Sequence, residues 1–443
     1  MPDAAVVIAV VSLVYAIFGV GVLSIPGLAI SAVLATAVLA ALLYAAPEVL
    51  VVVTPALLPL GTVVSIFFPF EFSFAALALI LGLQGIRRRA AWMVRLEWIE
   101  AANLGFIAWA VFTGFWCFDF AWYVHGVRRL LEGFAAFWVA NRLARVVPRS
   151  TFEVGLLLGA LALSLAALGK WLSTGWNVEQ TAFHRAAATD LGWGTANYIA
   201  TLLLLLSPLL LEAAMHSRQR WLRLPSWLAL VLIALMQGLI ASRAAALLFV
   251  FGTAVQAFAN RSRKLIGALL ITAALFGFVI SPLGQSFLSR FTSSRELASI
   301  AVRIWYFRVA WQRTVDHFPW GMGLNQGWTY PDRLFDRDPH NYWLALSSEL
   351  GLLGVAGWLS VLVLLWRRLS ALASDPDWQG VGRALMVSFC LGQLHTLVEP
   401  TFQGEQYQFV FFWIMGGYLG YYSMSRGARS RAPAQDAPAS STR

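Results

Sequence analysis

The sequence has few cysteines, few lysines and little charge of either sign. Cys117 and Cys390 are its two cysteines, so it cannot build a disulfide framework or a cysteine metal cluster. Charged residues make up 12% of the 443 residues, whereas about a quarter is usual in soluble proteins. Because 59% of the residues are hydrophobic, disordered, fibrous and disulfide-stapled classes are excluded, and a membrane protein is indicated.

The basic residues are almost all arginines, with Lys170 and Lys264 as the two lysines, and the net charge is +10. Such a balance can indicate nucleic-acid binding. In a protein with many membrane spans, however, basic residues usually mark cytoplasmic loops that face anionic lipid. We therefore expect membrane lipids as partners of these arginines and no nucleic acid.

Clusters of basic residues separate the apolar runs, and each interval between clusters is long enough for two crossings of a bilayer. The clusters begin at Arg87, Arg142, Arg218, Arg261, Arg367 and Arg426. If all of them face the cytoplasm, the outward connections lie near 118–126, 174–195, 241–243, 283–340 and 399–407. The pattern predicts an all-α polytopic membrane protein with about 12 to 14 transmembrane helices, at roughly 20 apolar residues each.

This pattern divides the chain into four parts. We expect a transmembrane bundle over 1–282, a large outer loop over 283–345, C-terminal transmembrane helices over 346–425 and a disordered cytoplasmic tail over 426–443. Within the loop, apolar residues recur every three or four positions from Leu297 to Val315. This spacing predicts an amphipathic helix that rests on the membrane or on the bundle.

Arg243 is the single charge in the apolar stretch Trp227–Asn260. One helix of that length would reach roughly 50 Å, whereas the hydrocarbon core measures about 30 Å. We therefore predict a break near Ala241–Arg243, which places Arg243 at the outer end of a hairpin. A guanidinium there suits an anion such as phosphate. The alternative is an arginine that anchors a helix end at the membrane surface.

His184 and Arg185 lie in the next outward segment. Arg185 is an isolated arginine on the side where positive charge is normally sparse. Pairing with Asp190 and binding of a phosphate explain it equally well. His184 beside it is better explained as a loop histidine than as a base.

His340 follows Asp338 and Pro339 at the end of the large outer loop. Asp followed by Pro is a good N-cap and first position, so we expect a helix to begin there with His340 in its first turn. A histidine that titrates near neutrality suits proton transfer. A capping and packing histidine is one alternative. A metal site made of Asp336, Asp338 and His340 is the least favoured, because the cap already uses Asp338.

Four further polar residues are secondary candidates. Glu349 lies about 180° from His340 on a helix, so it cannot be its partner on the same face, and we expect it to bond to neighbouring helices. Arg303 and Arg308 belong to the loop helix, where some arginines should contact lipid headgroups. Glu399 is part of a polar outer patch over 393–406 that lines a sugar cleft or is simply solvated.

Three segments in this order resemble the bacterial O-antigen ligase and polymerase superfamily of membrane glycosyltransferases. They are Ser242-Arg243-Ala-Ala-Ala-Leu-Leu, Pro319-Trp-Gly-Met-Gly-Leu, and His340-Asn341 followed by Glu349-Leu-Gly351-Leu-Leu-Gly354. The resemblance covers about residues 174–366.

The resemblance implies a GT-C-like helical fold with its active site at the periplasmic face of the inner membrane. The implied donor is a glycan on undecaprenyl diphosphate, which needs no nucleotide sugar and no cofactor. Arg185 and Arg243 would bind the diphosphate, His340 would be the base, and Asn341 beside it would contact substrate. Direct displacement would invert the anomeric centre, and we expect it to be independent of metal.

Three functions compete at this point. A ligase hands the glycan to lipid A-core, and the basic, aromatic loop helix favours this function because it suits an anionic lipid acceptor. A polymerase hands the glycan to another lipid-linked repeat. A transporter or flippase of lipid-linked glycans would place ionisable residues at the bilayer midplane, whereas here they gather at the outer rim.

Overall fold

The computed structural model describes residues 25–59, 73–79, 81, 97–173, 191, 196–240, 242–259, 294–327 and 339–431. These residues form helices and connections, without a β-strand among them, which confirms the predicted all-α class for this part of the chain. The helices are α2 Ile25–Ala45, α3 Pro47–Ala56, α5 Trp98–Phe112, η2 Thr113–Trp116, α6 Phe120–Leu143, α7 Arg149–Ser173, α9 Ala196–His216, α10 Arg220–Ile240, α11 Arg243–Ala259, α14 Ser294–Asp316, α15 Tyr342–Ser374, α16 Gln379–His395, η3 Thr401–Gln403 and α17 Glu405–Arg431.

Five of the described helical segments are long and apolar enough to cross a membrane: 98–116, α7, 197–216, α10 and α15. On α10, Leu228 and Val231 are more than half exposed, whereas Ile233 is fully buried. An exposed apolar face of this kind is typical of a helix that meets lipid. The chain is therefore a membrane protein. The predicted 12 to 14 spans include residues 1–24, 60–72, 82–96 and 260–293, which lie outside the described residues.

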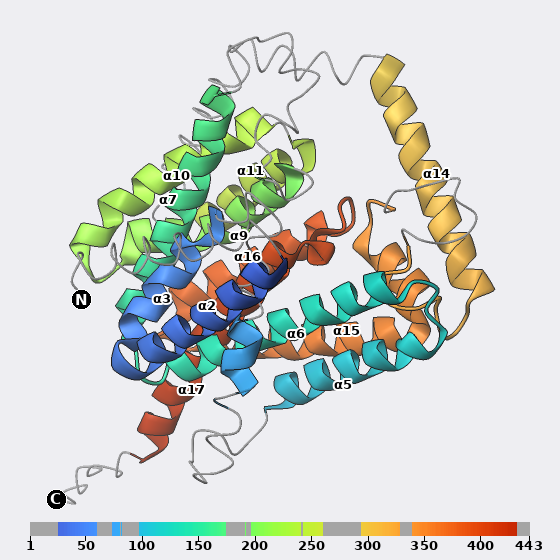
Figure 1. Cartoon of the computed structure of the whole chain (residues 1–443). Coiled ribbons are helices and arrows are strands. Elements are labelled where there is room, and N and C mark those ends of the chain that lie inside the picture. The colour runs from blue at the N-terminus through green and yellow to red at the C-terminus, as the bar shows by residue number, and fades with distance from the viewer. Residues whose placement is uncertain are drawn as a thin grey trace, which may run out of the picture.

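Helix packing depends on close backbone approach at glycines. Gly155 and Gly159 lie one turn apart on α7, and α3 passes over them: a Cβ on Gly155 would strike the carbonyl of Val51, and one on Gly159 would strike Pro55. Small residues at this spacing let two membrane helices approach closely, so that van der Waals packing holds them together. The central helix α17 lies against α6 in the same way, through Gly416 and Gly420. Figure 1 shows α17 running beneath the other helices towards the C-terminus.

Connections between the described helices gather at two ends of the bundle. At one end, which we call the Glu399 end, the Asn197 side chain donates to Glu399 at 2.8 Å. Gln237, near the last turn of α10, donates to the carbonyl of Ala200 at 2.8 Å. The start of α9, the end of α10 and the segment that carries Glu399 therefore meet at this end of the bundle.

The opposite end, which we call the Trp378 end, brings together connections that carry the basic clusters. Arg149 at the start of α7 lies 4.8 Å from the ring of Trp378, between α15 and α16. Arg383 near the start of α16 donates to the carbonyl of Ala259 at the end of α11, at 3.4 Å. Arg149, Arg218 and Arg429, which belong to three of the predicted clusters, line one cavity at this end. The side of the membrane that this end faces stays a prediction.

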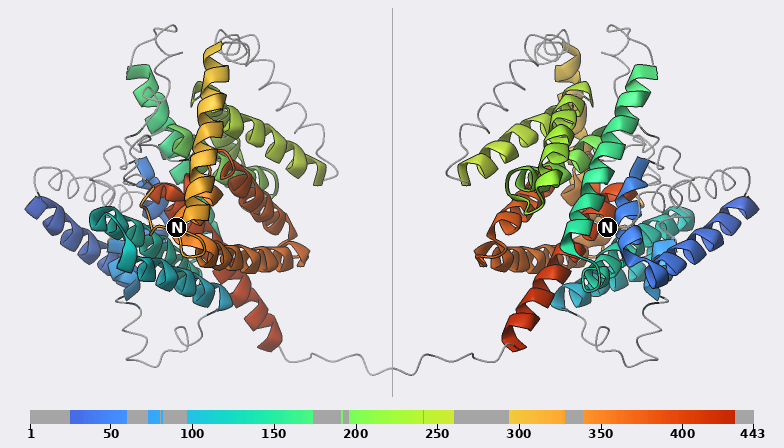
Figure 2. Two further views of the ribbon diagram at one scale, coloured as in Figure 1. Left: turned by 90° about the vertical axis from the view of Figure 1, so that its right-hand side faces the viewer. Right: turned by 90° about the vertical axis from the view of Figure 1, so that its left-hand side faces the viewer.

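The helix α14 lies at the right-hand edge of the molecule in Figure 1 and upright in front of the other helices in the left view of Figure 2, and one of its ends contacts α15 through Thr314 and Ser347. Its presence confirms the predicted loop helix. Ile304, Trp311 and Val315 from the apolar stripe are at least half exposed, so the bundle does not cover them.

The predicted disordered tail begins too early. α17 continues to Arg431, past residue 426. Arg429 forms ion pairs with Asp375 and Asp377, at 3.1 Å each. The last turns of α17 are therefore held by ion pairs to the connection after α15. The composition of the tail gave no sign of these ion pairs.

Candidate functional site

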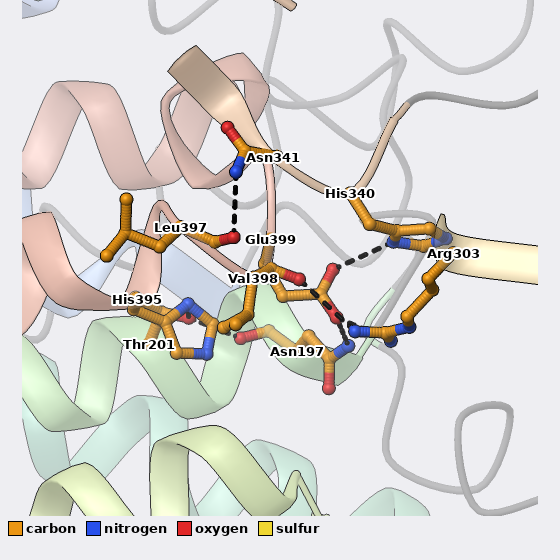
Figure 3. A network of polar contacts seen from close by, with 9 residues as sticks. All are labelled: Asn197, Thr201, Arg303, His340, Asn341, His395, Leu397, Val398 and Glu399. Atoms are coloured by element: carbon orange, nitrogen blue, oxygen red, sulfur yellow. Dashed lines mark hydrogen bonds and ion pairs between the residues drawn. The ribbon is translucent and has the colours of Figure 1, made fainter. Parts of the chain in front are cut away.

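Glu399 is the centre of the polar network at the Glu399 end. It lies between α16 and η3, and its side chain is only 6% exposed. One carboxylate oxygen, Oε2, lies 3.3 Å from His340 Nδ1. The other oxygen, Oε1, accepts from Asn197 Nδ2 at 2.8 Å and from Arg303 Nη2 at 3.2 Å. Figure 3 shows the carboxylate surrounded by these three partners, which come from three separate segments of the chain.

The charge of Glu399 is stabilised by its partners. Burial alone would raise the pKa of this carboxyl group. The hydrogen bond from His340 and the positive charges of His340 and Arg303 oppose burial, and the pKa is lowered below its ordinary value. Glu399 is therefore ionised at neutral pH. It can fix the tautomer of His340 and stabilise the imidazolium form.

An aromatic core beneath Glu399 holds its segment in place. Phe402, three residues further on, is 1% exposed. Its ring lies 4.8 Å from that of Trp358, 5.0 Å from that of Tyr407 and 5.4 Å from that of Tyr342. The turn that carries Glu399 is thereby anchored to α15 and α17, and this anchoring fixes the position of the carboxylate relative to His340.

His340 lies just before α15 and not in its first turn. Its side chain is 30% exposed, and its backbone has φ of 49°, in the left-handed region that non-glycine residues rarely adopt. The prediction that Asp338 and Pro339 begin the helix is therefore wrong: α15 begins at Tyr342, with Asn341 as its N-cap. Asn is as good a cap as Asp, and the left-handed His340 keeps the preceding residues out of the helix. Asp336 and Asp338 lie outside the described residues.

Both polar groups of the Asn341 side chain contact the protein. Its oxygen accepts from the backbone N–H of Leu344 at 3.0 Å, and its nitrogen donates to the carbonyl of Leu397 at 2.9 Å. These bonds tie the start of α15 to the segment that carries Glu399. They give Asn341 a structural role, and its contact with substrate stays a prediction.

Glu349 does not contact His340, as its helical position predicted, but its partners differ from those expected. Instead of neighbouring helices it binds a loop: the N–H groups of Asn325 and Gly327 donate to it, at 2.9 and 3.3 Å. The glycine-rich segment around Gly321 is a turn, and it crosses α15 at Gly351, where φ is 63°. A Cβ on either glycine would overlap the backbone of the other segment.

The arginines that the sequence singled out lie in different surroundings. Arg303 pairs with Glu399, whereas the side chain of Arg308 is exposed on α14. The break between Ile240 and Arg243 confirms the predicted hairpin, and α11 begins at Arg243, so its backbone lies at the Glu399 end. The Arg243 side chain lies outside the described residues, as do His184 and Arg185. Their predicted roles stay predictions.

A second buried ionic cluster, on α6, was not predicted from the sequence. Arg128 pairs with Glu405 and, at 3.5 Å, with Glu132, and His125 lies 3.0 Å from Glu405. Arg129 donates to the carbonyl of Gln403 at 2.7 Å. The sequence signal for such a cluster is a pair of adjacent arginines followed one turn later by a glutamate within a long helix that is rich in apolar residues.

A second histidine lies behind Glu399. His395 is fully buried, and its Nδ1 lies 3.0 Å from the hydroxyl of Thr201. It faces α9 and not the exposed side of the network (Figure 3). His340 is therefore the histidine of this network that a substrate can reach. Among the described residues, no group of three or more His, Cys, Asp or Glu side chains is placed to hold a metal ion.

In comparisons with known proteins, no protein-family model matches the chain, and no curated protein matches it. The function therefore has to be argued from the site itself.

Proposed function

We propose that this chain is a membrane glycosyltransferase of the O-antigen ligase type, with a GT-C-like arrangement of 12 to 14 spans in the bacterial inner membrane. It would transfer a glycan from undecaprenyl diphosphate to lipid A-core at the periplasmic face. The observation that carries the proposal is the pair His340–Glu399. A partly exposed histidine has its Nδ1 beside a buried, ionised carboxylate, at the end of the bundle opposite the basic clusters.

The pair suits general-base catalysis. With Nδ1–H directed to Glu399, Nε2 carries the lone pair and can accept a proton from an acceptor hydroxyl. The hydroxyl oxygen then forms a bond to the anomeric carbon, and the bond from that carbon to the diphosphate oxygen breaks. The proton stays on His340, where Glu399 compensates its charge, and undecaprenyl diphosphate leaves. Attack opposite the leaving group inverts the anomeric centre.

The proposal assigns the diphosphate to Arg243 and Arg185. Support comes from the start of α11, which lies at the same end of the bundle as His340. A guanidinium fork neutralises a leaving diphosphate without a metal. Arg303 does not fit this role in the structure, because its guanidinium is directed to Glu399. We assign it to the positioning of that carboxylate.

The test uses the purified full-length chain with a lipid-linked glycan as donor. One arm offers lipid A-core and the other offers only more lipid-linked glycan. Transfer to lipid A-core supports the ligase, chain growth on the lipid-linked glycan supports a polymerase, and movement across vesicles without a new glycosidic bond indicates a transporter.

The His340→Ala and His340→Gln variants test the base. General-base catalysis contributes about 10² to 10⁴-fold, so both variants should lose most turnover while they still bind the donor and keep wild-type thermal stability. Turnover at the wild-type rate contradicts the assignment. Inactivity that is explained by unfolding also contradicts it.

A further inference from the structure

A cavity of about 740 Å³ lies at the Trp378 end, far along the bundle from His340. It is enclosed by the start of α7, the end of α9, the connection between α15 and α16, and the last turns of α17. Its volume falls within the range of about 300 to 1,000 Å³ that is usual for small-molecule sites. The chemistry proposed for His340 and Glu399 does not use it.

The charges on the cavity wall are balanced. Three arginines and three carboxylates line it: Arg149, Arg218, Arg429, Glu153, Glu212 and Asp377. Its inner part is apolar, with Leu156, Leu209 and Leu210. The cavity therefore offers positively and negatively charged side chains beside an apolar surface. A lipid headgroup with its attached chain has the same combination of charged and apolar parts.

Two of the arginines are already paired. Arg149 donates to Glu153 at 2.8 Å and also lies over the ring of Trp378, and Arg429 pairs with Asp377 at 3.1 Å. Arg218, by contrast, is exposed in the turn between α9 and α10, and it makes no ion pair with a described residue. It is the cation on this wall that is best placed to bind an anionic group.

Glu212 supplies the opposite charge deeper in the wall. It is 6% exposed, it is the one charged residue of α9 before His216, and its Oε1 lies 2.9 Å from His216 Nδ1. The same oxygen lies against Gly380, where any Cβ would displace it. The first turn of α16, where Gly380 lies, thus leaves room for this carboxylate beside the cavity. A buried ionisable residue in a membrane helix is a strong indication of a functional site.

We propose that this cavity binds a zwitterionic phospholipid whose headgroup carries a phosphate and a primary ammonium, as phosphatidylethanolamine does. Arg218 binds the phosphate, the ammonium donates to the carboxylates of Glu212 and Glu153, and the glycerol and the first part of a chain lie against the leucines. A headgroup that has a phosphate but no ammonium can use Arg218 but brings no cation to the carboxylates. A zwitterion meets groups of opposite sign on both parts of the wall, and the wall therefore favours it.

The experiment measures lipid retained on the full-length protein in detergent by native mass spectrometry, with phosphatidylethanolamine and phosphatidylglycerol supplied at equal concentration. The wild type should retain more of the ethanolamine lipid. Arg218→Ala should lower this retention about tenfold or more, because a charge-assisted hydrogen bond is lost. Arg220→Ala is the matched control, since Arg220 lies two residues further on, is exposed, and does not line the cavity.

A second variant tests the selectivity. Glu212→Gln keeps the shape and removes the charge, so it should reduce the preference for the ethanolamine lipid over the glycerol lipid. Thermal unfolding of each variant confirms that it is folded. The proposal is overturned if no ethanolamine lipid is retained, if both lipids are retained equally by the wild type, or if Arg218→Ala and Arg220→Ala behave alike. Free inorganic phosphate that displaces the lipid completely would instead indicate a phosphate site without selectivity for lipid, and would also overturn it.

Discussion

Glu399 and Glu349 are both buried carboxylates at the same end of the molecule, but their surroundings differ. Among the described residues, the Glu399 carboxylate accepts only from side chains, and one of these, His340, is partly exposed. Glu349 accepts from two backbone N–H groups of the turn that crosses α15. The first arrangement leaves a titratable group in contact with the surroundings, whereas the second closes a loop onto a helix. A carboxylate therefore acquires a chemical role from the exposure of its partners and not from its own burial.

The largest effect expected from this comparison is on stability at Glu349. Glu349→Ala leaves the buried N–H of Asn325 and the partly buried N–H of Gly327 without their acceptor. A donor that loses its partner in this way costs about 1 to 3 kcal/mol, so the two together should make this the largest loss of stability. Chemical or thermal unfolding in detergent should show the loss. Wild-type unfolding together with lost transfer would contradict the structural role.

Glu399→Gln should affect turnover more than stability, which is the reverse of the effect expected for Glu349→Ala. It removes the charge that orients His340 but retains hydrogen-bonding capacity, so folding should be little affected. Turnover should fall by about 10²-fold, the lower end of what general-base catalysis contributes. Transfer rate and donor affinity, measured together, separate the two variants: a fall in donor affinity at unchanged turnover would show that Glu399 acts in binding and not through His340.

Phe402 tests whether the aromatic core positions Glu399. Phe402→Ala opens a cavity among Trp358, Tyr407 and Tyr342, and such a change typically costs about 3 to 5 kcal/mol. Phe402→Leu fills more of the space and should lose less stability. At a temperature where both variants are folded, both should have reduced turnover. Full turnover in Phe402→Ala would show that the carboxylate is positioned by its polar partners alone.

The sequence predicted the features that depend on local pattern. Apolar spacing predicted the all-α class and α14, and hydrocarbon thickness predicted the break before Arg243. It could not predict that Glu399, rather than a residue on the same helix, is the partner of His340, because that pairing joins residues 59 positions apart. The cap at Asn341 was missed for a different reason. Two good caps, Asp338 and Asn341, lie three residues apart, and only the left-handed backbone of His340 decides between them.

Asn341 offers a smaller and more specific test. Asn341→Ala removes the cap of α15 and should cost about 1 kcal/mol, whereas Asn341→Ser retains a capping oxygen and should cost less. If Asn341 only caps the helix, the serine variant keeps wild-type donor and acceptor affinity. If both variants lose affinity for a substrate equally, Asn341 contacts that substrate, as the resemblance implies.

The smallest expected effect is the pH dependence of Glu399. Its pKa in the folded protein is below the ordinary value, so the native state binds fewer protons than the unfolded state at this group. Stability from Glu399 is therefore fully present above the unfolded pKa, about 4.3, and is lost as the pH falls through the folded pKa. Unfolding of the wild type and of Glu399→Gln, measured from pH 8 down to pH 3, should give a constant difference above about pH 5 that diminishes only below it. A difference that instead changes well above pH 5 would contradict the assignment of this stability to the Glu399 carboxylate.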